Sequence, residues 1–434
     1  MRTNRITWAG RDAPALADQL RGRAQPPSGV AEEARALVES VRAGGDRRVL
    51  ELCESLDGVR PPALEVAPAR RAELAGAVSP QLRAALELAA ANIRAVAEAQ
   101  LVADEVVIEP GQGQRISSRE VPIRRAAIYV PGGRAPYPST VLMGAVPARV
   151  AGVSELVVAS PPGPGGAPHA AVLAACELAE VDVVYAIGGA QAIAALAYGT
   201  ESIAAVDLIA GPGGPWVQEA KLAVSSKVGI DGYAGPSELV VISDRGGNPT
   251  WLALDLCAQA EHGEGGLLVA IGIGAGVVGR LIDAVKDVAA EQETVAELEL
   301  AAVEAPGLDA AVELAEALAP EHLQLDCDGA ERAAVEIRRA GCVFVGAESA
   351  TAFGDYAAGS NHVLPTGGAA RYMGPLGPGT FRRRISTVRM TPQAAVELAP
   401  SVDEIARAEG FPMHGRSARA RAEQDDRKEG LRAR

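Results

Sequence analysis

The sequence predicts an α/β protein built from two doubly wound (Rossmann-like) parallel-sheet domains, with a helical N-terminal segment and a small helical C-terminal tail domain. The main observation is a series of short, continuously apolar runs, each followed by glycine or proline and then by a helical pattern. Strands buried on both faces of a parallel sheet have this uninterrupted apolar pattern. A second observation is that the first hundred residues carry apolar positions at helical spacing.

These patterns divide the chain into four parts. Residues 1–125 are expected to form a helical N-terminal segment that packs with the second α/β domain, and residues 126–235 the first Rossmann-like domain. Residues 236–375 are expected to form the second such domain, and residues 376–434 the tail domain. The expected strands are "AAIYV" (126–130), "ELVVAS" (155–160), "DVVYAIG" (182–188), "VDLIAG" (206–211), "ELVVISD" (238–244), "LLVAIGI" (267–273) and "GCVFVG" (341–346). The clearest expected helices cover residues 30–44 and 80–100, the latter with Pro80 in its first turn.

Composition excludes several classes of function. The 434 residues are 48% hydrophobic and 22% charged, which is typical of a globular protein. A net charge of −14 argues against nucleic acid as the main partner, because phosphate binding requires a basic surface. No stretch has the roughly 20 apolar residues that span a membrane. The five cysteines are scattered without a CxxC pair, so we expect reduced thiols and a cytoplasmic protein.

A literal G-x-G-x-x-G is present at Gly274, Gly276 and Gly279, after one apolar run and before a helical segment. That context resembles a dinucleotide fingerprint. The acidic residues about 20 positions further on lie in a solvated helical pattern and not at a strand end. We therefore interpret this motif as turn packing in a glycine-rich chain and not as a nucleotide site.

Glycine-rich turns follow three strands of the first expected domain. They are "YVPGGRAPYPS" (129–139), "GGAQA" (188–192) and "GPGG" (211–214). Ligands of α/β folds bind at the carboxyl ends of the strands, where these turns are expected to lie. Together the turns favour a ligand crevice along this edge over three unrelated loops.

Histidine is rare, and four of the five histidines follow a carboxylate within seven positions. In "PEHLQL", Glu321 and His322 are adjacent. Gln259 and His262 are three apart and would share one face of a helix, which alone is weak evidence for a metal site. Asp355 and His362 lie in a glycine-rich loop, and loops that concentrate such residues are often functional.

Eight blocks, in order along nearly the whole chain, resemble the histidinol dehydrogenase family. They are "YVPGG", "YPSTVLMGAVPARVAGV", "AIGGAQAIAALAYGTESI", "VGIDGYAGPSE", "AQAEH", "APEHLQL", "GDYAAGSNHVLPTGG" and "IARAEGFPMHGRS". The resemblance implies a zinc- and NAD-dependent enzyme that oxidises L-histidinol through histidinaldehyde to L-histidine, the last steps of histidine biosynthesis.

The resemblance also implies roles for individual residues. Glu321 and His322 would be the catalytic acid–base groups, with His322 taking the alcohol proton and Glu321 activating the water that hydrates the aldehyde. The implied zinc ligands are Gln259, His262, Asp355 and His414. The implied substrate contacts are these four residues with Ser237, His322, His362 and Glu409, and the implied NAD contacts are Tyr129, Gln191 and Gly214.

The sequence departs from the family pattern in three places. Gly214 replaces an asparagine that contacts NAD, Gly263 replaces an aspartate after "AEH", and the tail around His414 is richer in arginine. The resemblance implies a homodimer in which the tail crosses the two-fold axis, so that each active site receives His414 from the other subunit.

Two other functions remain open from the sequence. One is a related zinc- and NAD-dependent dehydrogenase of the same family that acts on another small alcohol, such as a sulfonated diol. Glu409 favours histidinol, since a carboxylate suits a cationic amino alcohol. The other is a catalytically silent zinc-binding regulatory protein, against which the intact Glu321–His322 pair argues.

Overall fold

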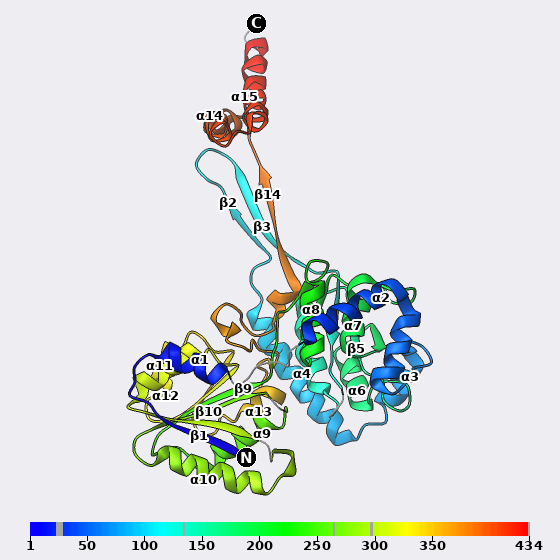
Figure 1. Cartoon of the computed structure of the whole chain (residues 1–434). Coiled ribbons are helices and arrows are strands. Elements are labelled where there is room, and N and C mark those ends of the chain that lie inside the picture. Colours follow the sequence, from blue (N-terminus) through cyan, green and yellow to red (C-terminus); the bar gives the residue numbers. More distant parts are fainter. Residues whose placement is uncertain (23–28, 133–134, 264, 296–297, 433–434) are drawn as a thin grey trace. The chain divides into compact units, whose positions relative to one another are not determined.

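The structure is a computed structural model that describes residues 1–22, 29–132, 135–263, 265–295 and 298–432 (Figure 1). The chain divides into two compact units. Unit 1 comprises Met1–Leu101 and Ile123–Phe381, and unit 2 comprises Val102–Pro122 and Arg382–Arg434.

The first sheet of unit 1 is fully parallel, with the strand order β6-β5-β4-β7-β8. Its strands are β4 (Arg125–Tyr129), β5 (Glu155–Ser160), β6 (Val183–Ala186), β7 (Leu208–Ala210) and β8 (Gly229–Ile230). The chain runs outward from β4 to β6 and then returns to the other side of β4. The switch point, where such folds bind ligands, therefore lies between β4 and β7.

Helices cover both faces of this sheet. One face carries α3 (Pro68–Ala75), α4 (Pro80–Gln100), α5 (Pro138–Ala151) and α6 (Ala170–Leu178). The other carries α2 (Val30–Leu52), α7 (Gly189–Tyr198) and α8 (Pro215–Val224), with a π-helical turn at Cys53–Asp57 after α2. Successive residues of β4 alternate between the two cores, with Ile128 in the first and Tyr129 in the second, as the period of a strand requires.

The second sheet is also parallel, with the order β1-β11-β10-β9-β12-β13. Its strands are β1 (Arg2–Thr7), β9 (Glu238–Ser243), β10 (Leu267–Ile273), β11 (Glu299–Ala305), β12 (His322–Asp326) and β13 (Cys342–Val345). One face packs on α1 (Ala13–Arg21), α11 (Leu308–Leu318) and α12 (Ala330–Glu336), and the other on α9 (Pro249–Ala260) and α10 (Val277–Ala290) (Figure 1). The short helix α13 (Thr351–Tyr356) and 3₁₀ turns at Glu293–Val295, Ala369–Arg371 and Pro378–Phe381 complete the unit.

The seven predicted strands are all present, as β4, β5, β6, β7, β9, β10 and β13, and the predicted helices appear as α2 and α4. The predicted packing of residues 1–125 is wrong for most of that segment. Only β1 and α1 join the second domain, whereas Val38 of α2 and Ile93 of α4 lie in the cores of the first. The apolar periodicity indicates which helix face is buried, but not which sheet covers it.

Unit 2 consists of a three-stranded antiparallel ribbon and two helices. The ribbon has the order β14-β3-β2, from β2 (Glu105–Ile108), β3 (Arg115–Pro122) and β14 (Arg382–Arg389). The helices are α14 (Pro392–Ala408) and α15 (Pro412–Arg432). The ribbon thus combines residues 102–122 with the tail, so the predicted boundaries at 125 and 376 do not separate these parts.

The turn after β10 contains the G-x-G-x-x-G motif. Gly274 and Gly276 have positive φ values of 94° and 83°, and Gly276 caps α10. Carboxylates of the neighbouring strand ends already accept backbone N–H groups there. Asp244 accepts from Gly246 at 2.7 Å and from Asp328 at 2.7 Å. This arrangement supports the interpretation of the motif as turn packing.

All five cysteines are free thiols. None of the helices in the described parts of the chain is both long enough and apolar enough to cross a membrane.

Candidate active site

A cavity of about 420 Å³ lies in unit 1 where the two sheets approach each other. The carboxyl-terminal edge of the first sheet contributes Gly132 and residues 212–215. The second domain contributes residues at the amino-terminal edge of its sheet, including Ser237 and His322. Eight of the predicted site residues line this cavity: Gly214, Ser237, Gln259, His262, Glu321, His322, Asp355 and His362. Segments that lie about a hundred residues apart in the sequence therefore line one cavity.

Parallel pairing explains part of this convergence. β12 pairs with β9 so that His322 lies opposite Leu239, which places Glu321 and Ser237 at the same edge of the sheet. The helix α9 ends at Ala260, and His262 follows in the turn, with its N–H bonded to the carbonyl of Gln259 at 3.3 Å. The predicted helical face therefore includes Gln259, but His262 lies just beyond the helix end.

His322 is the most buried histidine of the cavity edge, with 3% of its surface exposed. Its Nδ1 lies 3.1 Å from the carbonyl oxygen of Glu238 and 3.5 Å from Oε2 of Glu321. Both neighbours are acceptors, so Nδ1 carries a proton and donates it. Nε2, which lies 3.3 Å from Oδ1 of Asp355, is then the atom that gains or loses the second proton.

The electrostatic setting of His322 is acidic. Burial alone lowers the pKa of His322, but the charge of Glu321 and the hydrogen bonds to Asp355 and Glu321 outweigh burial and hold that pKa well above its ordinary value. Burial alone raises the pKa of Asp355, whereas the hydrogen bond and charge of His322 outweigh it and lower that pKa. Asp355 is therefore an anion that faces the cavity.

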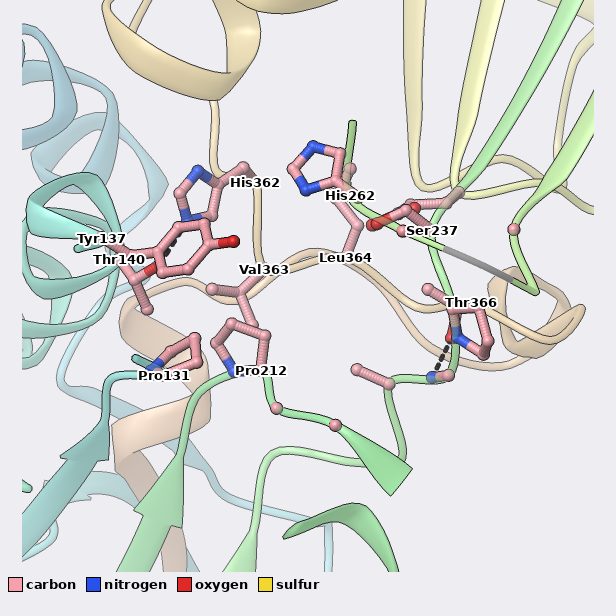
Figure 2. Close-up of a pocket in the computed structure, with 18 of the residues that line it drawn as sticks. Pro131, Tyr137, Thr140, Pro212, Ser237, His262, His362, Val363, Leu364 and Thr366 are labelled. Atoms are coloured by element: carbon pink, nitrogen blue, oxygen red, sulfur yellow. Dashed lines mark hydrogen bonds between the residues drawn. The ribbon is translucent and has the colours of Figure 1, made fainter. Parts of the chain in front are cut away.

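His362 joins the cavity loop to α5. Its Nδ1 lies 2.8 Å from the carbonyl oxygen of Asp355, and its Nε2 lies 3.2 Å from Oγ1 of Thr140 (Figure 2). Burial lowers the pKa of His362, and the nearby charge of Asp355 offsets only part of this effect. His362 is thus a neutral imidazole whose Nδ1 donates to the loop. Figure 2 shows its ring and that of His262 beside the same space, with Ser237 near His262.

Gln259 provides the observation that bears on a metal. Its side chain is 4% exposed and lines the cavity, yet its Nε2 has no hydrogen-bond partner among the described residues. An amide oxygen and nitrogen can exchange places with little change of shape, so the oxygen can occupy this unpartnered position. Zinc accepts oxygen and nitrogen ligands, and the set of Gln259, His262 and Asp355 supplies both. The donor set therefore fits zinc.

The structure contains no cluster of three or more His, Cys, Asp or Glu side chains close enough to hold a metal within its described ranges. The proposed set contributes only two such residues from unit 1, His262 and Asp355. The third donor in unit 1 is an amide, and the fourth predicted ligand, His414, belongs to unit 2.

The switch point of the first sheet forms the other wall of the cavity. Gly214 caps the N-terminus of α8, and a Cβ at this position would meet no atom within 4 Å, so the backbone is open to a ligand. A helix N-terminus of this kind suits an anionic phosphate. Gly211, with φ of 120°, is held by Asp231, which accepts its N–H at 2.7 Å, and by Lys221, which donates to its carbonyl at 3.0 Å.

Two predicted NAD contacts lie below the surface of this edge. The hydroxyl of Tyr129 accepts the N–H of Gly189 at 3.0 Å, and Gln191 donates to Asp57 at 3.3 Å. Tyr129 is 3% exposed, Gln191 is fully buried, and neither lines the cavity. Of the predicted NAD residues, only Gly214 lines the cavity in this structure.

Glu409 and His414 lie in unit 2. Glu409 ends α14, and His414 lies in the first turn of α15, with its ring centre 5.5 Å from that of Phe411. Both predicted residues are exposed. They share the turn between the two helices, where Gly410 has a positive φ of 77°.

Sequence reasoning missed other residues of the cavity. Tyr137, Thr140, Tyr233 and Tyr356 also line it. Thr140 had a usable signal, because it lies in the first turn of a helix that follows a glycine-rich strand end. The three tyrosines had none, since their positions depend on how the loops fold.

A buried acid within α9 gives a test of how stability depends on pH. Asp255 is 7% exposed and accepts from Nε2 of Gln324 at 2.7 Å, while Oε1 of Gln324 has no partner among the described residues. Burial raises the pKa of Asp255, and the hydrogen bond from Gln324 offsets only part of this effect. The folded state therefore holds a proton that the unfolded state releases, and stability falls as pH rises through that interval.

Asp255→Asn is expected to stabilise the protein by about 1 kcal/mol at neutral pH, because an amide can donate to Oε1 of Gln324 and carries no buried charge. The gain should shrink as pH falls toward 4, where the wild-type carboxyl is protonated. Urea unfolding across this range measures the effect, with Asp283→Asn on the exposed side of α10 as the matched control. A variant that is less stable than wild type at neutral pH would contradict this expectation.

Comparison with known proteins agrees with this geometry. The family model described as histidinol dehydrogenase matches residues 21–422. A histidinol dehydrogenase of Synechococcus sp. is 40% identical over 96% of this chain and 98% of the relative. One from Ruegeria pomeroyi is 43% identical over 89% of this chain and 90% of the relative. The crystal structure of histidinol dehydrogenase from Elizabethkingia anophelis superposes with a TM-score of 0.88 and 28% identity, covering 98% of this chain and 99% of that one. The chain belongs to the histidinol dehydrogenase family.

Proposed function

We propose that this chain oxidises L-histidinol to L-histidine in two successive NAD-dependent steps, with Glu321 and His322 as the acid–base groups. The observation that carries the proposal is the cavity itself. It joins the glycine-rich switch point of the first sheet to a buried Glu–His pair and to the amide, imidazole and carboxylate of Gln259, His262 and Asp355. Each oxidation transfers a hydride to the nicotinamide and releases a proton, so a hydride acceptor and a base must share one space.

His322 is the proposed base for the alcohol. Its Nδ1 donates to the carbonyl of Glu238, which fixes the ring and leaves Nε2 toward the cavity side, near Asp355. Nε2 takes the hydroxyl proton as hydride leaves the carbon. Nε2 must be free of its second proton for this role, and zinc bound to Asp355 would weaken one of the two carboxylate contacts that raise the pKa of His322.

Glu321 is the proposed base for water in the second oxidation. Its carboxylate contacts the described residues through Oε2, which accepts the N–H of Glu238 at 2.7 Å and lies 3.5 Å from Nδ1 of His322. Oε1 is therefore the oxygen available to a water. As Glu321 takes a proton from that water, the water oxygen bonds to the aldehyde carbon and the former carbonyl oxygen takes up a proton, which gives the hydrate. Loss of a hydride to NAD and of a proton from the hydrate then gives the carboxylic acid.

Zinc would be held by Gln259, His262 and Asp355, with His414 of a second copy as the fourth protein ligand. When bound, it would orient the substrate by taking its nitrogen atoms as ligands. NAD would lie on the first-sheet edge, with its phosphates toward the open backbone at Gly214.

Unit 2 supports the proposal of a homodimer. Its ribbon and helices bury few side chains of their own, namely Ser117, Ala394, Ala399 and Ala406. Large apolar side chains that remain exposed in the unit include Val106, Ile108, Val388, Ile405, Phe411 and Met413. Such a surface is typical of a segment that packs on a partner, and Glu409 and His414 lie beside Phe411 in the sequence.

The direct test is the appearance of NADH when the purified zinc-loaded protein receives L-histidinol and NAD. Two NADH per histidinol and L-histidine as the product are expected. Rescue of a histidine auxotroph that lacks this enzyme tests the same function in cells. Turnover of a sulfonated diol with no turnover of histidinol would favour the related dehydrogenase instead, and zinc binding without either activity would favour a regulatory protein.

Removing the metal should show that zinc and NAD bind at different sites. Chelation, or Asp355→Ala, is expected to abolish turnover while NAD binding changes little, because the proposed zinc ligands and the first-sheet edge are different walls of the cavity. Zinc content and NAD titration by fluorescence measure the two effects. Asp244→Ala, at the opposite edge of the second sheet, is the matched control for loss of a carboxylate. An equal loss of NAD binding on chelation and in Asp355→Ala would contradict separate sites.

A further inference from the structure

A single buried carboxylate lies directly behind the Glu321–His322 pair. Glu238 is the first residue of β9, is 3% exposed and does not line the cavity. Its carboxylate accepts four N–H groups. They come from Nη1 of Arg21 at 2.7 Å, Nη2 of Arg21 at 3.2 Å, the backbone of Gly367 at 2.9 Å and the backbone of Glu321 at 3.2 Å. These four hydrogen bonds fix the Glu238 carboxylate in one orientation.

Glu238 and Glu321 hold each other reciprocally. The register of β9 with β12 places them at adjacent strand starts. Oε2 of each carboxylate accepts the backbone N–H of the other residue, at 3.2 Å on Glu238 and 2.7 Å on Glu321. The carbonyl of Glu238 also meets Nδ1 of His322 at 3.1 Å. Both groups of the pair therefore take their positions from Glu238.

Arg21 supports this arrangement from the end of α1. Besides its two bonds to Glu238, it donates from Nε to the carbonyl of Leu318 at 2.9 Å and from Nη2 to that of Ala319 at 3.3 Å. Ala319 has a positive φ of 45°, which is unfavourable for alanine, and it leads into Pro320 and Glu321. Arg21 thus fixes the turn before the pair as well as the carboxylate behind it.

Arg21 also supports the Glu321–His322 pair through its charge. Glu238 and Glu321 are both buried, with 3% and 6% of their surface exposed. Each carboxylate accepts the backbone N–H of the other residue, so two negative charges lie close together. The guanidinium of Arg21 forms an ion pair with Glu238 at 2.7 Å. Without this cation Glu238 would be an unpaired buried charge beside Glu321, and the side chain would turn away or take up a proton. Rotation of the side chain would remove the acceptor of the Glu321 N–H, and protonation would weaken it.

We infer that Arg21 and Glu238 are positioning residues for the Glu321–His322 pair, and that Arg21 acts by holding and neutralising Glu238. The inference rests on the proposed function of Glu321 as the base for water. Neither residue lines the cavity, so neither contacts substrate or NAD directly. Arg21 binds the carboxylate of Glu238, which holds Glu321, whereas His322 is held by the backbone carbonyl of Glu238, so the effect of Arg21 passes mainly through Glu321.

Arg21→Met tests the inference, because it removes the charge and the fork while keeping an apolar stem. Histidinaldehyde oxidation is expected to slow by about tenfold or more, since small displacements of a catalytic group have effects of this size. The first hydride transfer from histidinol should slow less, and the KM for NAD should stay within about twofold. Rapid mixing with each substrate separates the two rates. Arg5→Met, which breaks an exposed ion pair with Glu304 in the same sheet, is the matched control.

The double variant Arg21→Met/Glu238→Gln isolates the charge. It should recover at least about threefold of the loss in Arg21→Met, because no unpaired carboxylate remains and the amide oxygen still accepts the N–H of Glu321. If Arg21→Met does not fold, Arg21→Lys keeps the cation without the fork and should show a smaller loss with the same preference for the aldehyde step.

Three results would overturn the inference: no loss in Arg21→Met of the step that Glu321→Gln slows most, an equal loss of both rates, or a double variant no faster than Arg21→Met. Glu321→Gln is the reference that separates this inference from the proposed function. If Glu321→Gln slows the alcohol step instead, and Arg21→Met follows it in milder form, the role of Glu321 is wrong and the positioning by Arg21 stands.

Discussion

His322→Asn should slow both oxidations by roughly 10²–10⁴-fold, because each step releases a proton and asparagine cannot accept one. The asparagine can still donate toward the carbonyl of Glu238, which His322 meets at 3.1 Å, so the fold around β12 should remain. Glu321→Gln should slow oxidation of the aldehyde more than that of the alcohol, since only the aldehyde step needs an activated water. Rapid-mixing measurements of NADH with histidinol and with histidinaldehyde distinguish these patterns.

Because Glu321 and His322 are buried, substituting either one can disturb more than its proposed catalytic role. Glu321 is 6% exposed and His322 3%. Loss of the His322 ring therefore removes a group that lowers the pKa of Asp355, and loss of the Glu321 charge removes one that raises the pKa of His322. Zinc content and melting temperature should therefore be measured for both variants. A Glu321→Gln enzyme that binds zinc normally and slows the alcohol step alone would show that the two roles are reversed.

The pattern of apolar residues predicted most of the first domain and part of the second. Strands such as β5 and β10 contain uninterrupted apolar runs, which favour strands buried in a parallel sheet. β12 was not predicted, because its five residues include the buried polar side chains of His322, Gln324 and Asp326. β11, "ELAAVEA", contains mainly alanine and glutamate, which favour helices when read in isolation. Only its pairing with β10 and β1 makes it a strand.

The family pattern names several residues that the structure places at the cavity, and it does not name those whose position depends on packing. Ser237, Gln259 and Asp355 line the cavity. Tyr129 alternates into the opposite core of its sheet, and Gln191 is buried on α7, so neither faces the cavity here. Glu238 and Arg21 carry no motif of their own. Their importance follows from the register of β9 with β12 and from the end of α1, which a single sequence does not specify.

Mixing two inactive variants should restore activity if His414 serves the other copy's active site. His262→Ala and His414→Ala homodimers are each expected to be inactive, since each lacks one proposed zinc ligand in every site. In a heterodimer, one site receives both damaged parts and the other receives an intact cavity with an intact tail. Random co-refolding makes half of the dimers mixed, each with one working site of two, so about a quarter of wild-type activity should return.

If His414 acts within its own subunit, the mixture should have a different activity. If His414 binds zinc in its own subunit, every site in the mixture keeps one lesion, and activity stays at the level of the separate variants. Refolding His414→Ala with His169→Ala checks that mixing itself does no harm, because His169 only caps α6 and lies outside the cavity. Here His169→Ala alone should be fully active, and the mixture should keep about half of wild-type activity, since half of all tails then carry His414. Recovery to about a quarter in the first mixture, with about half in the second, requires a tail that crosses between subunits. The exposed Phe411 and Met413 beside His414 are the side chains that such a crossing would bury.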